Sequence, residues 1–115
     1  MSKVVNVKVA NIRPKYKNLK EWMDDPNNCY IGRSGIVFID GSRFPKTASI
    51  WSNPFKITST QTRDDVLKLY EAYIRKKIID EDLYDELEYL RNKNLGCWCT
   101  PHRCHGDILI KILSE

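Results

Sequence analysis

The first residues of the chain are β-branched valines that begin to alternate with polar side chains. Residues 4–9 have this pattern, which predicts a strand whose side chains point alternately to two faces. The strand is expected to end before Pro14, because proline has no amide hydrogen to donate to a central ladder. Residues 15–23 are then predicted to hold a short helix or turn, and residues 24–28 a loop.

The middle of the chain has short apolar runs, a turn signal and then a long stretch without a period. Tyr30–Ile31 and Ile36–Ile39 are strand candidates. The Asp40–Gly41 pair that follows predicts a two-residue turn in a hairpin near residues 36–44. Residues 42–61 have no clear period but contain several large apolar side chains. A loop of this length is either functional or packs its own aromatic residues on the core, and the pattern favours neither.

The second half of the chain has helical periodicity on both sides of one short apolar run. Thr62 is a candidate N-cap, and the apolar positions after it predict an amphipathic helix over residues 63–78. A second helical stretch is expected over residues 83–90, because three leucines lie there on one stripe. Residues 95–99 are predicted to form a buried strand, and the segment from residue 104 onward a last helix.

This order of elements predicts a single α/β domain, residues 1–115, in which helices cover a small sheet. Hydrophobic residues make up 42% of the chain and charged residues 30%, which excludes a disordered, collagen-like or coiled-coil protein. The apolar runs are far shorter than the roughly 20 residues of a membrane-spanning helix. The first ten residues also have no signal-peptide core. We therefore expect a cytoplasmic protein with no membrane partner, whose four cysteines are thiols or metal ligands rather than disulfides.

Positive charge is concentrated in the first half of the chain. The net charge is +6 over residues 1–60 and −2 over residues 61–115, which gives the overall +4. Basic and aromatic residues also interleave in the first half, an arrangement in which rings stack on bases and cations meet phosphates. The same aromatic residues are equally suited to a core. A non-catalytic nucleic-acid-binding module is therefore an alternative function, and the binding expected of it is weak and sensitive to salt.

The densest group of reactive side chains lies in one short segment near the end of the chain. Residues 97–107 contain three of the four cysteines and both histidines. Zinc prefers such ligands, but structural zinc sites combine two separated pairs, whereas here Cys104 and His105 are adjacent and their side chains diverge. We expect no bound metal, and a zinc-stabilised interaction domain remains a further alternative.

Two other interpretations of this segment stay open. Cys97 precedes Arg103 by six residues, as in the phosphate loop of cysteine phosphatases, although such loops contain small residues where this one has Trp98 and Pro101. Alternatively, Cys97 and Cys99 lie on one face of a strand and are simply buried in the core, as free cysteines usually are.

Two turns elsewhere in the chain are candidate parts of the same site. Arg33 lies in the Gly32–Gly35 segment, where glycines let the backbone approach a ligand closely. Asn53 begins Asn-Pro-Phe, a turn that would hold its side chain at the rim of a pocket. Ligands of α/β proteins bind beyond the carboxyl ends of strands, near helix N-termini. We therefore expect Arg33, Asn53 and the 97–107 segment to converge on one concave pocket.

Several motifs together resemble one family. These are Asn11-Ile12-Arg13-Pro14, Tyr30-Ile31-Gly32-Arg33, Asn53-Pro54-Phe55, Leu95-Gly96-Cys97-Trp98-Cys99 and Cys104-His105-Gly106-Asp107. They are similar to the family called domain of unknown function four-three-two-six, found in bacteria, bacteriophages and large DNA viruses. The resemblance implies a Rossmann-like α/β domain with a ligand site at the motif loops, and its distribution suggests nucleotide or nucleic-acid metabolism. It implies no particular reaction or cofactor.

The leading hypothesis is a small α/β protein that binds a nucleotide-like or other anionic ligand and acts on it as an enzyme. The candidate catalytic residues are His105, Asp107 and Cys97, since an imidazole titrates near neutral pH and acids are favoured at helix starts. The candidate ligand-binding residues are Arg13, Arg33, Asn53, Cys99 and Cys104.

Overall fold

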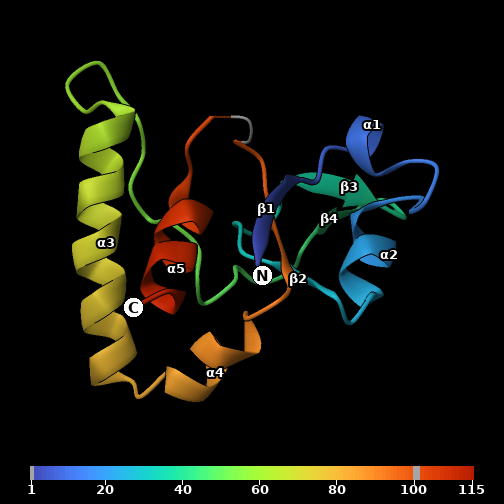
Figure 1. Cartoon of the computed structure of the whole chain (residues 1–115). Coiled ribbons are helices and arrows are strands. Elements are labelled where there is room, and N and C mark those ends of the chain that lie inside the picture. Colours follow the sequence, from blue (N-terminus) through green and yellow to red (C-terminus); the bar gives the residue numbers. More distant parts are fainter. Residues whose placement is uncertain (1, 100–101) are drawn as a thin grey trace.

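Three parallel strands form the main sheet, and the strand that comes last in the sequence lies in the middle. The computed structural model describes residues 2–99 and 102–115. Strands β1 (Lys3–Asn6), β5 (Asn94–Cys97) and β2 (Asn28–Tyr30) pair in the order β1–β5–β2. Because all three strands run in the same direction, their carboxyl ends meet at one edge of the sheet (Figure 1).

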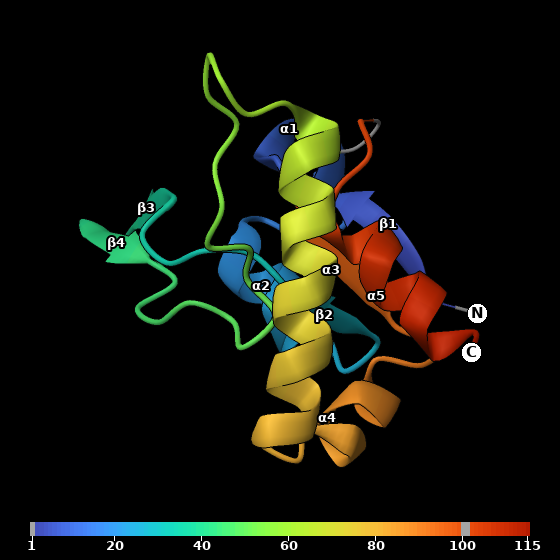
Figure 2. The same cartoon turned by 90° about the vertical axis from the view of Figure 1, so that its left-hand side faces the viewer.

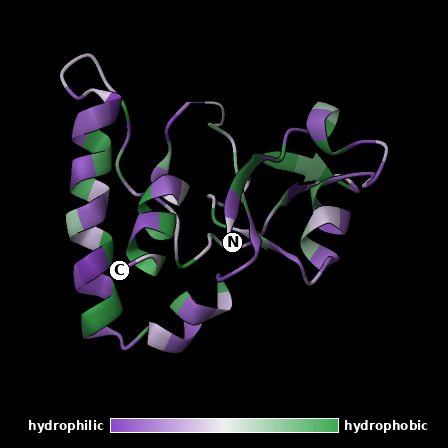
Figure 3. Ribbon diagram, viewed as in Figure 1, coloured by the Kyte–Doolittle hydropathy of each residue, from purple (hydrophilic) through white to green (hydrophobic). Residues whose placement is uncertain are grey.

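Helices cover both faces of this sheet (Figure 1). Helices α5 (His105–Leu113) and α3 (Arg63–Asp80) pack on one side, with α4 (Tyr84–Tyr89) at the far end of α3. Helices α2 (Leu19–Asp24) and α1 (Val9–Ile12) lie on the other side. Figure 3 shows hydrophilic and hydrophobic bands alternating along α3, as expected of a helix with one buried face.

The two faces of the sheet have separate hydrophobic clusters. The cluster beneath α3 and α5 includes Tyr70, Ile74, Leu95 and Leu109, each of them completely buried. The cluster on the opposite face contains Val7, Ile12, Leu19, Trp22 and Tyr30. The sheet therefore lies inside the molecule, and only its edges and strand ends are open to a ligand.

A second, two-stranded sheet projects from the body of the molecule (Figure 2). Its antiparallel strands are β3 (Val37–Ile39) and β4 (Ser42–Phe44). Asp40 and Gly41 connect them with positive φ angles of 53° and 79°, as a tight hairpin turn requires. The hairpin predicted near residues 36–44 is confirmed.

The structure confirms the α/β class and corrects several strand boundaries. Strand β2 begins at Asn28, inside the predicted loop, and ends at Tyr30, before Ile31. The first strand ends at Asn6, not at residue 9, because the Asn6 side chain accepts a hydrogen bond from the Lys8 amide at 2.9 Å and turns the chain into α1. Strand β5 likewise ends at Cys97, two residues before the predicted end. Part of the turn predicted after it, Thr100 and Pro101, lies outside the described residues. The Rossmann-like arrangement stays a prediction.

Removal of the α3 N-cap is expected to destabilise the protein by about 1 kcal/mol. Thr62 Oγ1 accepts a hydrogen bond from the Asp65 amide at 3.2 Å, and Asp65 Oδ2 accepts one from the Thr62 amide at 2.9 Å. Thr62→Ala removes one half of this capping box. Urea unfolding of this variant, with the exposed Thr47→Ala as the matched control, measures the loss. Equal midpoints for the two variants would contradict the expectation.

Candidate functional site

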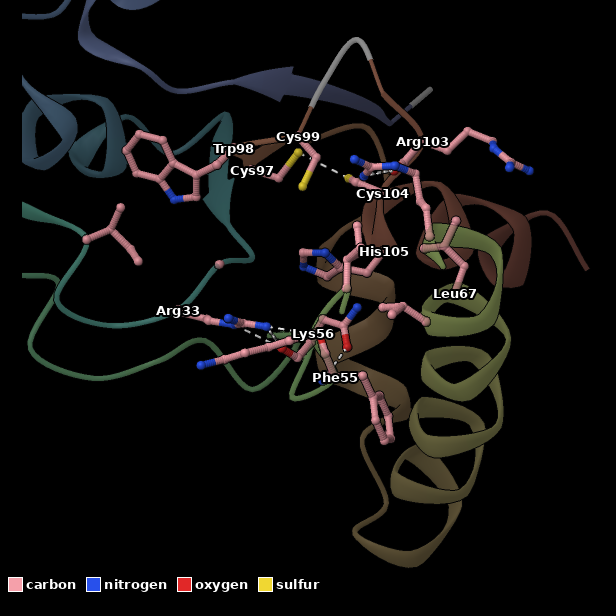
Figure 4. Close-up of a pocket in the computed structure, with 16 residues that line it drawn as sticks. Arg33, Phe55, Lys56, Leu67, Cys97, Trp98, Cys99, Arg103, Cys104 and His105 are labelled. Carbon is pink, nitrogen blue, oxygen red and sulfur yellow. Dashed lines mark hydrogen bonds between the residues drawn. The ribbon is translucent and has the colours of Figure 1, made fainter. Parts of the chain in front are cut away.

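A cavity of about 520 Å³ lies beyond the carboxyl ends of β2 and β5 (Figure 4). Its walls come from the turn after β2, the loop before α3, the first turns of α3, and the segment between β5 and α5. Arg33, Asn53, Cys97, Cys99, Cys104 and His105 all line it. The predicted convergence of these three parts of the chain on one cavity is therefore confirmed, whereas the roles assigned to the residues stay predictions.

Arg33 fixes one wall of the cavity by binding backbone carbonyls. Its Nε and Nη2 atoms donate to the carbonyl oxygen of Asn53 at 3.1 and 2.9 Å, and Nη2 also donates to that of Phe55 at 3.0 Å. The guanidinium reaches both acceptors with Nη2 and holds one of them a second time with Nε, whereas a lysine side chain is one bond shorter and has a single nitrogen. Arg33 thus shapes the loop before α3, and its charge faces the same cavity.

The loop before α3 is held at two further points. Asn53 Oδ1 accepts a hydrogen bond from the Phe55 amide at 2.9 Å, which closes the Asn-Pro-Phe turn on itself. Tyr70, buried on α3, donates its hydroxyl to the Trp51 carbonyl at 2.7 Å. The sequence left a functional and a packing interpretation open for residues 42–61. Within that stretch, residues 51–55 form a wall of the cavity and also pack on the core.

A chain of hydrogen bonds joins the ends of β2 and β5. Trp98 Nε1 donates to the Tyr30 hydroxyl, which donates to the Arg33 carbonyl, both at 2.8 Å. Gly32 makes this geometry possible, because a Cβ atom there would lie 2.4 Å from the Tyr30 hydroxyl oxygen. Glycine at this position is therefore required by the close approach of a ring, and the same hydrogen bonds fix Trp98, one of the residues that line the cavity.

His105 is the buried imidazole of the cavity. It is only 8% exposed, and its Nε2 lies 2.7 Å from the Ile31 carbonyl oxygen, so Nε2 carries the proton. Every fully buried side-chain nitrogen or oxygen among the described residues has a hydrogen-bond partner. No described residue bonds Nδ1, which therefore is not fully buried. This leaves a ring nitrogen with a free lone pair in a residue that lines the cavity.

Acidification below about pH 6.5 is expected to destabilise the protein through His105. Burial lowers the pKa of this imidazole below its ordinary value. The unfolded chain therefore takes up a proton at a higher pH than the folded one, and stability present above pH 6.5 is lost as the pH falls. Thermal unfolding between pH 7.5 and 5 measures this slope, and His105→Gln should flatten it. The exposed His102→Gln should leave it unchanged; equal slopes in all three proteins would contradict the expectation.

Two thiols lie together in the wall of the cavity. Cys97 Sγ and Cys104 Sγ are 3.1 Å apart, and Cys104 Sγ accepts a hydrogen bond from the Gly106 amide at 3.3 Å. The contact with Cys97 and burial together raise the pKa of the Cys104 thiol, which is therefore protonated at neutral pH. Within the described ranges, no three side chains of the metal-binding types are arranged to hold an ion. The expectation of no bound metal stays a prediction.

Two candidate residues lie outside the cavity. Arg13 is exposed at the end of α1, where its Nε donates to the Lys17 carbonyl at 3.2 Å. Asp107 is exposed on α5 and accepts a hydrogen bond from the Cys104 amide at 3.0 Å, so that its carboxylate completes a capping box. Neither residue lines the cavity, so the structure does not bring them to the other candidates.

The rim of the cavity contains cations that the sequence analysis did not assign to the site. Lys56 and Arg63 line it, as does Arg103, which forms an ion pair with Asp64. Arg63 donates to the Arg103 carbonyl at 3.0 Å and ties the first turn of α3 to the segment before α5. The sequence did contain a signal for Arg63. It directly follows the N-cap residue Thr62, so it lies at the N-terminal end of α3, where a ligand could bind. None of the described lining residues is an aspartate or glutamate.

Fold and cavity together define a small α/β protein with a candidate ligand site at the carboxyl edge of a parallel sheet. The chain belongs to the family described as Domain of unknown function (DUF4326), which matches residues 15–115. The family to which the sequence motifs pointed is thereby confirmed.

The relatives of the chain include proteins of a giant virus and a bacteriophage. An uncharacterized protein of Acanthamoeba polyphaga mimivirus is 33% identical over 99 residues, which cover 77% of this chain and 70% of that protein. An uncharacterized 12.4 kDa protein of the nrdA-td intergenic region of enterobacteria phage T4 is 36% identical over 55 residues, covering 47% of this chain and 51% of that protein. No solved structure matches the chain. Among the described residues, no helix has the length and apolar character to cross a membrane.

Proposed function

We propose that the protein binds a nucleotide-like ligand in this cavity and that His105 accepts a hydrogen bond or a proton from it. The observation that carries the proposal is a mainly apolar cavity bordered by basic side chains, into which no described carboxylate projects. A nucleotide has the matching parts, a flat base and an anionic tail. The proposal includes a Rossmann-like arrangement of the domain, because ligands of Rossmann-like folds bind at this edge of the sheet.

The size and lining of the cavity suit a heterocyclic base. Its volume of about 520 Å³ lies within the range of small-molecule sites. Ile36, Phe55, Val66, Leu67 and Trp98 supply apolar and aromatic surface. A base that packs on this surface removes apolar area from water, which favours binding without requiring a particular hydrogen-bond pattern.

The charges at the rim suit a phosphate. Among the described residues no carboxylate forms an ion pair with Lys56 or Arg63, so both cations are available to a ligand. Arg33 and Arg103 add positive charge from opposite sides, although each has partners of its own. Phosphate recognition by arginine and lysine rests on such charge-assisted hydrogen bonds.

His105 supplies the polar group inside the cavity. The Ile31 carbonyl fixes the tautomer in which Nδ1 has a lone pair, and burial keeps the ring neutral at pH 7. A neutral imidazole in this position accepts a proton from an amino or hydroxyl group of the ligand. The Cys97 and Cys104 thiols lie beside it and shape the wall, as Figure 4 shows.

Isothermal titration calorimetry with AMP, GMP, CMP and UMP, each paired with its nucleoside, tests the proposal. We expect at least one monophosphate to bind with a stoichiometry near one and more tightly than its nucleoside. Arg63→Ala should weaken that binding by about tenfold, the effect of one lost charge-assisted contact. Lys20→Ala, an exposed basic residue on α2 that does not line the cavity, is the control. Binding of none of the four, or equal binding of nucleosides and monophosphates, would overturn the proposal.

A further inference from the structure

A second cavity, of about 560 Å³, lies next to the first at the same edge of the sheet. It is lined by Asn6, Lys8, Asn11, Arg63, Trp98, Cys99 and His102. Asn6 ends β1, and Trp98 and Cys99 follow β5, so this cavity lies beyond the carboxyl ends of those two strands. The first cavity lies beyond β5 and β2. The central strand therefore has one cavity on each side of its carboxyl end.

The two cavities share one wall. Arg63, Trp98 and Cys99 line both of them. Trp98 is held in place by its hydrogen bond to Tyr30, and Arg63 by its hydrogen bond to the Arg103 carbonyl. A ligand group that contacts Arg63 in the first cavity is thus next to the second cavity.

The second cavity differs chemically from the first. Five of its seven described lining residues are asparagines, basic residues or a histidine, whereas aliphatic and aromatic residues make up a larger part of the first cavity. The described lining residues again include no carboxylate. Lys8 and Arg63 bring positive charge, and Asn6, Asn11 and His102 bring hydrogen-bonding groups of the kind that recognise hydroxyls. This composition suits a phosphate followed by a sugar or another polyhydroxylated unit.

We infer that the ligand of this protein is a two-part nucleotide, in which a diphosphate joins the nucleoside to a second polar unit. The nucleoside occupies the first cavity, the diphosphate crosses at Arg63, and the second unit occupies the cavity lined by Lys8 and Asn11. The inference rests on the proposed function, since it assigns the base to the cavity beside His105. It predicts that a mononucleotide fills only half of the site.

Titration calorimetry with two series of probes tests this inference: AMP, ADP and ADP-ribose, and UMP, UDP and UDP-glucose. In the series whose monophosphate binds, the two-part compound should bind at least about tenfold more tightly than the monophosphate, because it gains the contacts of the second cavity. Lys8→Ala should remove most of that gain and leave the affinity for the monophosphate within about twofold. Lys20 lines neither cavity, so the control variant Lys20→Ala should change neither affinity.

The outcomes separate this inference from the proposed function. If a monophosphate binds but the two-part compound binds no more tightly, or Lys8→Ala weakens both equally, the inference is wrong and the proposed function stands. If neither series binds, this inference is wrong, and the proposed function then depends on the titrations with GMP and CMP. Circular dichroism of Lys8→Ala shows that an altered affinity does not come from unfolding, and Asn11→Ala, which alters the same cavity without a change in charge, should reduce the gain in the same direction.

Discussion

Arg33→Lys is expected to lower the free energy of unfolding by about 2–3 kcal/mol and to weaken ligand binding at the same time. The variant keeps the positive charge, but a lysine side chain ends one bond short of Nη2, the nitrogen that donates to both the Asn53 and Phe55 carbonyls, and it has no counterpart of Nε. The loop before α3 then loses its tie to the turn after β2. Because both segments line the cavity, stability and affinity should fall together.

Chemical denaturation and calorimetry with the best-binding monophosphate measure these two effects. Arg13→Lys is the matched control, since Arg13 also donates to a carbonyl but is exposed and lies outside the cavity. A charge effect alone would leave Arg33→Lys as stable as this control, and that result would contradict the role assigned to the guanidinium.

Gly96→Ala is expected to destabilise the protein by about 3 kcal/mol, because the added methyl group has no room. A Cβ atom at this position would lie 2.4 Å from Trp22 Cη2 and 2.8 Å from Val7 Cγ1. Gly96 is in the middle strand of the sheet, and both contacts come from the cluster on the α2 side. The strand or the tryptophan must move, which disturbs the packing of α2.

A double-mutant cycle checks the cause of this destabilisation. Trp22→Leu removes the two ring atoms nearest to the added methyl group, Cη2 and Cζ3. Gly96→Ala should therefore cost at least about 1 kcal/mol less in the Trp22→Leu background than in the natural chain. Equal costs in the two backgrounds would place the strain somewhere other than the Trp22 ring.

The features that the sequence predicted well are those determined by neighbouring residues. The Asp40–Gly41 turn and the Thr62 cap depend on groups within four positions of one another, and both occur as expected. The first strand is shorter than the valine pattern predicted, and the cause is local. The Asn6 side chain accepts a hydrogen bond from the Lys8 amide, which ends the strand at Asn6. The insertion of β5 between β1 and β2 was not predictable in this way, because strand partners are chosen by contacts across the whole chain.

For the candidate site, the sequence predicted which segments of the chain come together better than it predicted what each residue does there. Glycine-flanked Arg33 and the Asn-Pro-Phe turn did indicate one cavity together with the 97–107 segment, of which Asp107 lies outside the cavity. The sequence shows that Arg33 has a charge but not which acceptors it faces, and here they are backbone carbonyls. Asp107 was expected at the site because acids are favoured at helix starts, and that same preference places it in the capping box with Cys104.

The position of β5 has a consequence for how the chain folds during synthesis. Within residues 2–99 and 102–115, strands β1 and β2 do not pair with each other, and each has only β5 as its neighbour. No part of the parallel sheet forms on the ribosome until residues 94–97 have left the exit tunnel, however long β1 has been available. The nascent chain meanwhile exposes the valines of β1, and its helices have no sheet to pack on. Folding is therefore a late event that depends on contacts between distant residues, and such folding is slow.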